Sequence, residues 1–325
     1  AAEDAQDHAI INVQGASPKI INNHFNNFNI DGQTESAVIL CNNSSSLIEN
    51  NKFKDGMVAL NYTLAGWILS KDSNLNINNN QMVNGYVGFA DPAGYIVSVN
   101  SDNSITANKF MNVSMGYCYT CAAIVMLDES NCSISNNLII RATGDGYGAI
   151  VASGSQYVSH NNTFASNNGG YSNLFSNGIV NNDIIINYAN GWETPIYLDE
   201  YSTIQISYSN IEGGYEGEGN INIDPLFADS DNDIYTLHED SSCIDAGIAD
   251  LDGDGTNDIF DFYGIAPDMG AYEYVPENNI LGDINYDGTI NVVDIVVLVN
   301  ISLTGEYSPQ GDLNNDNINN ILDIV

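Results

Sequence analysis

Basic residues are almost absent from this chain. Its 325 residues include six Lys or Arg against 42 Asp or Glu, which gives a formal net charge of −36. So negative a surface repels nucleic acid and anionic lipid, and it repels itself unless cations or salt compensate. The composition therefore argues against a direct nucleic-acid partner and favours divalent metal or a saline medium, although an acidic coat that serves solubility alone explains part of the excess.

Long hydrophobic runs are also missing. No stretch approaches the roughly 20 apolar residues of a transmembrane helix, and the longest apolar-rich run, Val292 to Val299, is interrupted by Asp294. No signal peptide opens the sequence, so we expect a processed form or an internal fragment if the protein is exported. Apolar residues nevertheless make up 43% of the chain, enough for one large domain and a small one.

Cysteine is scarce, and its spacing is not decisive. Cys118 and Cys121 form a CxxC pair, but no second pair follows at zinc-ribbon spacing. The remaining cysteines are Cys41, Cys132 and Cys243. Both a disulfide and buried free thiols fit this pattern, so cysteine usage does not define the redox compartment.

Asparagine, by contrast, is abundant and periodic. A motif recurs in which an apolar residue, one or two polar residues and Asn precede a large apolar residue, as in IINNHF, IENNKF and INNNQM. The last Asn of successive copies recurs at intervals of 28, 29, 28, 29, 25 and 20 residues, and a weaker eighth copy follows 28 residues later. These residues are Asn23, Asn51, Asn80, Asn108, Asn137, Asn162, Asn182 and Asn210. Such a period predicts a solenoid.

The segments between the motifs predict β coils. Short runs rich in Val, Ile and Tyr, such as YIVSV and AIVML, are bounded by Gly and Asn, and no window sustains a 3.6-residue period. Strands one coil apart are parallel and about 4.8 Å apart, so eight coils would form a rod ~40 Å long. We expect the recurring Asn to adopt the left-handed turn and to hydrogen-bond its copies in adjacent coils, with the apolar residue two places later pointing inward.

With these features the chain resembles the right-handed parallel β-helix proteins of the pectate-lyase-like superfamily, many of which are secreted. The resemblance covers about residues 9–275 and is specific for fold rather than activity. The stretches NIDPLF, SSCIDAG and DMGAYEY resemble the closing segment of many secreted β-helix proteins. The resemblance implies an all-β right-handed parallel β-helix of about eight coils over residues 1–275, with a closing segment at 212–275, and an extracellular or cell-surface location.

An acidic loop within the closing segment has the ligand spacing of an EF-hand. Oxygen-bearing side chains fill offsets 1, 3, 5, 7, 9 and 12, and Gly255 stands at the sharp turn. The predicted Ca²⁺ ligands are Asp250, Asp252, Asp254, Thr256, Asp258 and Asp261. Random clustering of acids in so acidic a chain is the competing explanation.

Two matching segments at 282–325 follow a short linker at 276–281 and repeat the same offsets. The predicted ligands of the first loop are Asp283, Asn285, Asp287, Thr289, Asn291 and Asp294. Those of the second loop are Asp312, Asn314, Asp316, Ile318, Asn320 and Asp323. Ile318 offers its backbone carbonyl, as position 7 of such loops does. Calcium prefers six to eight hard oxygens around one ion, so the pattern predicts two calcium sites.

Loops 29 residues apart, each closed by Asp, resemble a type I dockerin module. The resemblance implies a small α-helical, EF-hand-like module that docks onto a cohesin-like domain or another surface protein. Val292 and Val293, like Ile321 and Leu322, stand where familiar dockerins often carry small hydroxyl residues, which leaves the partner open. The chain stops at Val325, before a second helix could form, so we expect a truncated module or a fragment. The first coil also lacks a covering helix, which allows end-to-end self-association.

No catalytic cluster stands out, and the catalytic residues are unknown. The β-helix lyases use bound calcium with an Arg or Lys as the base, but an ion pair with Asp145 is the simpler interpretation of Arg141, the single arginine. Carboxylate pairs such as Asp128 with Asp102 suit glycoside hydrolysis in principle, yet among 42 acids such pairs are uninformative.

The aromatic residues of the later turns allow two interpretations: a sugar-stacking strip or ordinary packing, which we favour. They are Tyr171, Trp192, Tyr197, Tyr201, Tyr208 and Tyr215. The sequence thus favours a non-enzymatic structural or adhesive protein, carbohydrate-associated and docked through its C-terminal module. The alternative is a polysaccharide lyase or glycoside hydrolase carried by a dockerin, and a calcium-dependent screen against polysaccharides separates the two.

Overall fold

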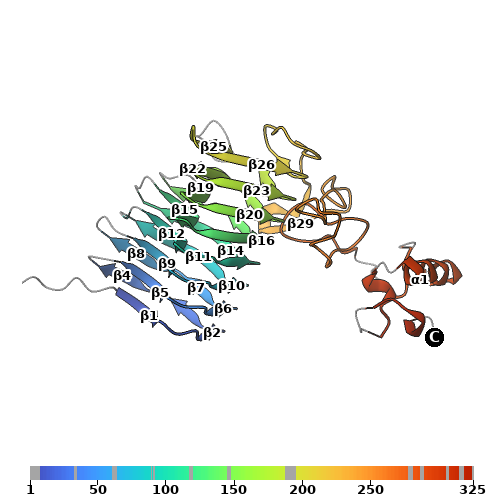
Figure 1. Ribbon diagram of the computed structural model, residues 1–325, viewed down its shortest axis with the longest axis horizontal. Coiled ribbons are helices and arrows are strands. Elements are labelled where there is room, and N and C mark those ends of the chain that lie inside the picture. Colours follow the sequence, from blue (N-terminus) through green and yellow to red (C-terminus); the bar gives the residue numbers. More distant parts are fainter. Residues whose placement is uncertain are drawn as a thin grey trace, which may run out of the picture.

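The computed structural model is a stack of short strands followed by a non-repetitive segment and a small helical module (Figure 1). It describes residues 8–32, 35–60, 64–88, 90, 92–116, 120–144, 148–186, 195–276, 281–285, 289–304, 307–314 and 318–323. Among these residues, no helix has the length and apolarity that crossing a membrane requires.

The strands form three parallel sheets, so the predicted parallel β-solenoid is confirmed. Sheet A contains β1 (His8–Gln14), β5 (Ser36–Asn42), β9 (Ala65–Lys71), β12 (Ala93–Val99), β15 (Cys121–Leu127), β19 (Gly148–Ser153), β22 (Tyr171–Leu174) and β25 (Ile196–Leu198). Sheet B contains β2 (Lys19–Ile21), β6 (Leu47–Glu49), β10 (Asn76–Asn78), β13 (Ser104–Thr106), β16 (Asn131–Ser135), β20 (Gln156–His160), β23 (Asn177–Asn181) and β26 (Thr203–Ser207). Sheet C contains β3 (His24–Asn26), β7 (Lys52–Lys54), β11 (Gln81–Gly88), β14 (Lys109–Met115), β17 (Leu138–Ile140), β21 (Thr163–Ala165), β24 (Ile184–Ile186) and β27 (Asn210–Ile211). It is extended by β4 (Asn29–Gly32), β8 (Met57–Leu60) and β18 (Thr143–Gly144).

The solenoid has about six regular turns, fewer than the eight that the Asn motifs predict. In the described residues, sheet A leads from β1 through β5, β9, β12, β15 and β19 to β22, which is six full turns. The strands beyond are short, with three residues in β25 and two in β27. The step between paired residues also shrinks from 28 (Ala93 to Cys121) to 21 (Ile150 to Tyr171), so the last coils are smaller.

The core consists of columns of similar side chains, one from each coil. Sheet B contributes the buried isoleucines Ile20, Ile48, Ile77, Ile105 and Ile134. Sheet C contributes the apolar residue of the Asn motif, at Phe53, Met82, Phe110, Ile139 and Phe164. These motif residues point inward, as the alternation of side chains along a strand predicts.

Sheet A is buried on both faces. Ile39 and Cys41 belong to the main core, whereas Leu40 between them belongs to a separate apolar cluster, which we call the sheet A seam. The seam consists of Ala37, Leu40, Leu69, Val97, Ala122, Val125 and Val151. Gly94 lies under it: a Cβ atom there would stand 3.0 Å from the carbonyl oxygen of Ala122 and from Val125 Cγ2. The absence of a Cβ at Gly94 therefore allows the seam side chains to pack directly against β12. The strands β5, β9, β12 and β15 are buried along almost their whole length.

The recurring Asn forms a buried ladder through the solenoid. Asn51 donates its Nδ2 to Asn80 Oδ1 (3.0 Å), and its own Oδ1 accepts the backbone N–H of Asn23 (2.9 Å). The same bonds continue upward from coil to coil. The predicted left-handed turn of this Asn is wrong, because the residue before it adopts that conformation, as at Asn50 (φ 56°) and Asn79 (φ 51°). The first Asn of each pair thus forms the turn, and the second forms the hydrogen-bonded ladder.

The last ladder positions also differ from the prediction. Asp183, rather than Asn182, accepts the backbone N–H of Asn162 (2.6 Å). In the next coil Ser209, rather than Asn210, accepts the N–H of Asp183 (3.1 Å). The ladder therefore continues past the Asn residues with a carboxylate and then a hydroxyl.

The segment after the last coil covers the outer face of sheet C. Its hairpin consists of β28 (Phe227–Asp229), the 3-10 turn η1 (Ser230–Asn232) and β29 (Ile234–Leu237). Tyr235 and Ala271 pack against Leu138 and Ile140. The side chain of Asn182 donates to and accepts from the backbone of Ile248, both bonds at 2.8 Å. The later coils of sheet C are thus covered by the non-repetitive segment that follows the last coil.

The C-terminal module contains one described α-helix, α1 (Val292–Thr304), which begins within the last residues of the first predicted calcium loop. The second loop lies between the 3-10 turns η2 (Pro309–Gly311) and η3 (Ile321–Asp323). Most of the predicted linker, at 277–280, is outside the described residues. In the described residues, an α-helix therefore accompanies the first loop and a single 3-10 turn closes the second.

Candidate metal centre

The first C-terminal loop wraps around its closing carboxylate. Asp294 lies in the first turn of α1, and its Oδ1 accepts the backbone N–H groups of Ile284 (2.8 Å) and Asn285 (3.1 Å). Its Oδ2 accepts the N–H of Asn291 (2.8 Å). Residues from both ends of the loop are thus tied to the Asp294 side chain.

The second loop repeats this arrangement. Asp323 accepts the N–H groups of Leu313 (3.0 Å) and Asn314 (3.3 Å) through Oδ1, and that of Asn320 (2.9 Å) through Oδ2. Each of these residues lies 29 positions after its counterpart in the first loop, so the sequence duplication is also a duplication of geometry. Asp312 in addition accepts a hydrogen bond from the hydroxyl of Tyr307 (3.0 Å).

The opening and closing carboxylates of both loops are buried. Asp283 and Asp294 in the first loop, and Asp312 and Asp323 in the second, are each at most 3% exposed. Burying two carboxylates in so small a loop is costly unless a cation or hydrogen-bond donors compensate. Carboxylate, amide and carbonyl oxygens at these offsets are the donor set of a Ca²⁺ site, so the described residues fit that ion.

The remaining predicted ligands of these loops lie nearby in the chain. Asn291 and Asn320 each donate Nδ2 to the backbone carbonyl two residues earlier, that of Thr289 (3.1 Å) and that of Ile318 (3.4 Å). Asp287 and Asp316 lie outside the described residues.

The loop at 250–261 brings three of its predicted ligands together. Asp250, Asp252 and Asp254 each offer a carboxylate oxygen, all within 4.8 Å of one another. The two oxygens of Asp250 accept backbone N–H groups of Gly253 (2.8 Å) and Gly255 (2.9 Å), and Gly255 has the positive φ of 91° that the turn position requires.

The far half of this loop is arranged differently. Asp258 accepts the N–H of Leu251 (2.8 Å), and Thr256 donates its hydroxyl to Asp254. The hydroxyl and the backbone N–H of Thr256, which both donate to Asp254, hold the pKa of the Asp254 carboxyl below its usual range. Asp261, the predicted closing ligand, is exposed. The cluster therefore lies at the surface, unlike the buried acids of the C-terminal loops.

Three carboxyl groups in the closing segment were not singled out by the sequence. Asp268 is fully buried and accepts the N–H groups of Asp245 (2.8 Å) and Tyr274 (2.6 Å). Burial raises its pKa to about 6, and burial together with the charge of Asp268 raises the pKa of Glu273 to about 7. Asp245 accepts the N–H of Ile265 (2.8 Å). Asp268 and Glu273 belong to the DMGAYEY stretch and Asp245 to SSCIDAG, so these two stretches were the sequence signal, and the backbone partners of the acids indicate that they hold the closing segment in place.

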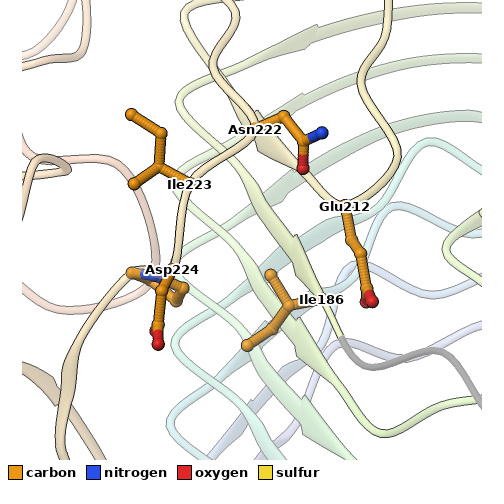
Figure 2. Close-up of a pocket in the computed structure, with 6 residues that line it drawn as sticks. Ile186, Glu212, Asn222, Ile223 and Asp224 are labelled. Carbon is orange, nitrogen blue, oxygen red and sulfur yellow. The ribbon is translucent and has the colours of Figure 1, made fainter.

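Two surface hollows border the same segment. The smaller, of about 280 Å³, lies between the end of β24 and the chain beyond β27, and Figure 2 shows Glu212 and Asp224 on opposite sides of Ile186. The larger, of about 620 Å³, is lined by the hairpin and by Glu273 and Tyr274. Neither hollow contains the predicted calcium ligands.

Arg141 is engaged in an ion pair. Its Nη2 lies 2.7 Å from Asp233 Oδ1, and its Nε donates to Asn112. Arg141 is therefore an ion-pair residue, as expected, and the partner that the structure describes is Asp233. Asp145, the partner expected from the sequence, lies outside the described residues. Cys121 is disulfide-bonded, whereas Cys41, Cys132 and Cys243 are free and buried.

The later-turn aromatics divide into two groups. Tyr171 is buried, and its hydroxyl bonds Asp183 inside the solenoid. Tyr197 and Tyr201 are exposed, and Tyr201 stacks on Phe175, which the sequence did not single out. Tyr208 and Tyr215 are partly buried, and Trp192 is outside the described residues.

These observations define a parallel β-solenoid protein with a duplicated acidic loop at its C-terminal end. No protein-family model and no curated protein matches the chain. Among solved structures, pectate lyase Pel9A is similar at 12% identity over 83% of this chain and 86% of that one, with a TM-score of 0.25. QnrB1, a plasmid-mediated fluoroquinolone resistance protein, is similar at 15% identity over 60% of this chain and 93% of that one, with a TM-score of 0.16. At such values neither likeness bears on function, and the fold rests on the strand pairing of this chain.

Proposed function

We propose that this protein is a secreted or cell-surface scaffold that binds Ca²⁺ through its two C-terminal loops and docks to a partner through the module they form. The observation that carries the proposal is the matched geometry of Asp294 and Asp323, each buried and each accepting three backbone N–H groups from its own loop. The solenoid would then serve as a rigid spacer, because each coil is locked to the next by strand pairing and by the ladder.

The bound ion would supply the positive charge that this chain lacks. In the first loop Asp283, Asn285 and Asp294 would hold it, together with the Thr289 carbonyl and the predicted ligands Asp287 and Asn291. A chain with six basic residues has few side chains that could neutralise four buried carboxylates. We therefore expect metal binding and folding of the module to be coupled, as in other small metal-dependent domains.

Calcium titration of the full chain tests the metal sites. We expect two calorimetric binding events, one lost in Asp294→Asn and one in Asp323→Asn, because each change removes the charge that closes a loop. Chelator should reduce the far-ultraviolet helix signal of α1 and leave the β signal intact. Asp31→Asn, an exposed acid in β4, is the control and should bind as the wild type does. Absence of binding at millimolar Ca²⁺, or a double variant that keeps every binding event of the wild type, would refute the proposal; a single event left in the double variant would belong to the separate acidic loop around Asp250.

The helix α1 offers a surface for docking. Val292, Val296, Val299 and Leu303 recur at the spacing of one helix face and are 70%, 56%, 38% and 80% exposed. A contiguous apolar face of this kind fits a complementary apolar groove, and we take a cohesin-like domain as the partner.

Immobilised cohesin-like domains test this part of the proposal. We expect binding in Ca²⁺ that is lost in chelator and lost in Val296→Asp, with Asp31→Asn again as the control. Binding that is unaffected by chelator and by Val296→Asp, or no binding to any such domain, would contradict the docking part of the proposal. The calcium sites are tested separately by the titration.

A further inference from the structure

The three faces of the solenoid differ in what covers them. Sheet A is closed by its own apolar seam, and the later coils of sheet C are covered by the closing segment. Two outward rows of sheet B remain exposed on its later strands. They are formed by Asn131, Gln156, Asn177 and Thr203, and by Ser133, Val158, Ile179 and Gln205. We call these two rows the sheet B face, which runs across β16, β20, β23 and β26 in the green to yellow part of Figure 1.

The sheet B face carries no charge, although the chain as a whole has a net charge of −36. The strands β10, β13, β16, β20, β23 and β26 read NIN, SIT, NCSIS, QYVSH, NGIVN and TIQIS, without an Asp, Glu, Lys or Arg. Burial lowers the pKa of His160, the single histidine among them, so it too is uncharged at neutral pH. Six consecutive uncharged strands in so acidic a protein indicate a surface built for an uncharged ligand.

The chemistry of the face is that of hydrogen bonding with small apolar contacts. Amides and a hydroxyl recur along the first row at the strand spacing of about 4.8 Å, and the second row places Val158 and Ile179 between Ser133 and Gln205. Thr203 Oγ1 donates to Asn177 Oδ1 (2.6 Å), which links neighbouring coils along the row. Val158 and Ile179 are 39% and 45% exposed and are flanked by these polar groups.

A stacked aromatic pair stands at the margin of the face. The rings of Phe175 and Tyr201 are 4.9 Å apart and 8° from parallel, and both side chains are more than 60% exposed. Each lies two residues before an exposed polar residue of the first row, Asn177 or Thr203. Asp199 fixes both backbones, because its carboxylate accepts the N–H of Phe175 (3.0 Å) and that of Tyr201 (3.1 Å).

The position of Phe175 is unfavourable for folding alone. Its φ is 52°, a left-handed conformation that bulky residues rarely adopt, and the preceding coil places Gly154 at the corresponding corner with open space around it. An exposed phenylalanine in a strained corner adds little to the core, so its stacking on Tyr201 is better explained by a ligand.

We propose that the sheet B face, with Phe175 and Tyr201 at its margin, binds an uncharged polysaccharide. The C–H face of a sugar ring would lie against the aromatic stack, whose π face is electronegative, and sugar hydroxyls would pair with the amides and hydroxyls of the rows. An anionic glycan does not fit, because a carboxylate stands at each end of the site: Asp102 accepts a hydrogen bond from Asn131 of the first row (3.1 Å), and Asp199 lies beside the aromatic pair. This site extends beyond the calcium-dependent docking proposed above and does not depend on it.

Affinity electrophoresis of the full chain through gels that contain a soluble polysaccharide tests this inference. The probes are hydroxyethyl cellulose, xylan and galactomannan, with polygalacturonate as the anionic contrast, each in chelator and in Ca²⁺. We expect retardation by at least one neutral probe under both conditions and none by polygalacturonate in chelator. Phe175→Ala and Tyr201→Ala should each weaken retention at least tenfold, whereas Tyr201→Phe, which keeps the ring, should retain it.

Phe260→Ala is the matched control, because Phe260 is 71% exposed but lies in the closing segment. Equal loss in Phe260→Ala and Phe175→Ala, or no retention by any neutral probe, overturns the inference. Ile179→Asp tests the rival occupant, a second copy of the chain. A dimer in light scattering that Ile179→Asp dissociates would make the face a self-association surface and would also overturn it.

Discussion

Asp183 occupies the ladder position that Asn fills in the coils before it, and it is the ladder residue with a titratable side chain. It accepts hydrogen bonds from the Tyr171 hydroxyl (2.5 Å) and from the backbone of Asn162 (2.6 Å). Burial nevertheless dominates and raises its pKa to about 7, from an ordinary value of 3.8. The neighbouring hydroxyls of Tyr171 and Tyr157 have pKa values raised well above 10, so they stay neutral over this range.

This carboxyl group makes the stability of the solenoid depend on pH. The folded state keeps the Asp183 proton up to pH ~7, whereas the unfolded chain releases it near pH 4, so the folded state binds more protons between these values. Its contribution is fully present below pH 4 and is lost as pH rises to ~7, by up to about 4 kcal/mol. We expect Asp183→Asn to remove this loss and to be the more stable protein at pH 7.5. Denaturant unfolding at pH 4.5 and 7.5 measures the free energy of unfolding of both proteins. If the variant and the wild type differed in this free energy by the same amount at both pH values, the prediction would be contradicted.

The ladder also shows how far a motif can be interpreted. The spacing predicted buried Asn residues that bond their copies, and the buried Asn51, Asn80 and Asn108 do so. It did not separate the turn residue from the ladder residue, because both are Asn in most copies. It also misplaced the ladder at Asn182, since Asn and Asp are both acceptors at adjacent positions. Only the register of the neighbouring coil distinguishes them.

At the scale of the element, the sheet A seam depends on glycine. A Cβ at Gly94 would lie 3.0 Å from a backbone oxygen, which cannot move away as a flexible side chain could. We expect Gly94→Val to destabilise the protein by about 2–4 kcal/mol through this overpacking. Gly154→Asn is the control, since nothing lies within 4 Å of its Cβ position and the residue has the positive φ that Asn tolerates. Thermal unfolding should show a clear loss for the first variant and little change for the second. Similar melting temperatures for Gly94→Val and Gly154→Asn would mean that the side chains of the seam can move to accommodate the added valine, and would contradict the prediction.

Strands and their parallel order were predictable at this scale, but their coverings were not. The short β-rich runs and the 28-residue period are local signals, and they suffice to place the strands. The packing of Tyr235 and Ala271 on sheet C joins residues about a hundred positions apart and leaves no periodic trace. The shortened last coils were misjudged for the same reason, because an Asn at roughly the right interval does not reveal the size of the coil around it.

At the scale of the whole molecule, the dominant property is charge. Sequence composition alone predicts self-repulsion, and the described ion pairs are few against 42 acids: Lys54–Asp55, Lys71–Glu35, Arg141–Asp233 and His238–Asp240. The acids of the C-terminal loops are buried in pairs, whereas the described acids of the solenoid are at least partly exposed, apart from Asp183. Screening by salt and specific binding of Ca²⁺ should therefore stabilise different parts of the protein.

Calorimetry of the full chain in a salt series separates these effects. In chelator, raising NaCl from 0.05 to 0.5 M shortens the screening length to below about 10 Å, and we expect the melting temperature of the solenoid to rise by several degrees as repulsion between its exposed acids weakens. At matched ionic strength, Ca²⁺ should add stability to the C-terminal module alone, and Mg²⁺ should do so less because it prefers a smaller octahedral site. A solenoid transition that is insensitive to NaCl would show that its acids are already compensated, for example by bound cations. A solenoid transition that responds to Ca²⁺ and not to NaCl would point instead to the acidic loop around Asp250 as a metal site that secures the closing segment.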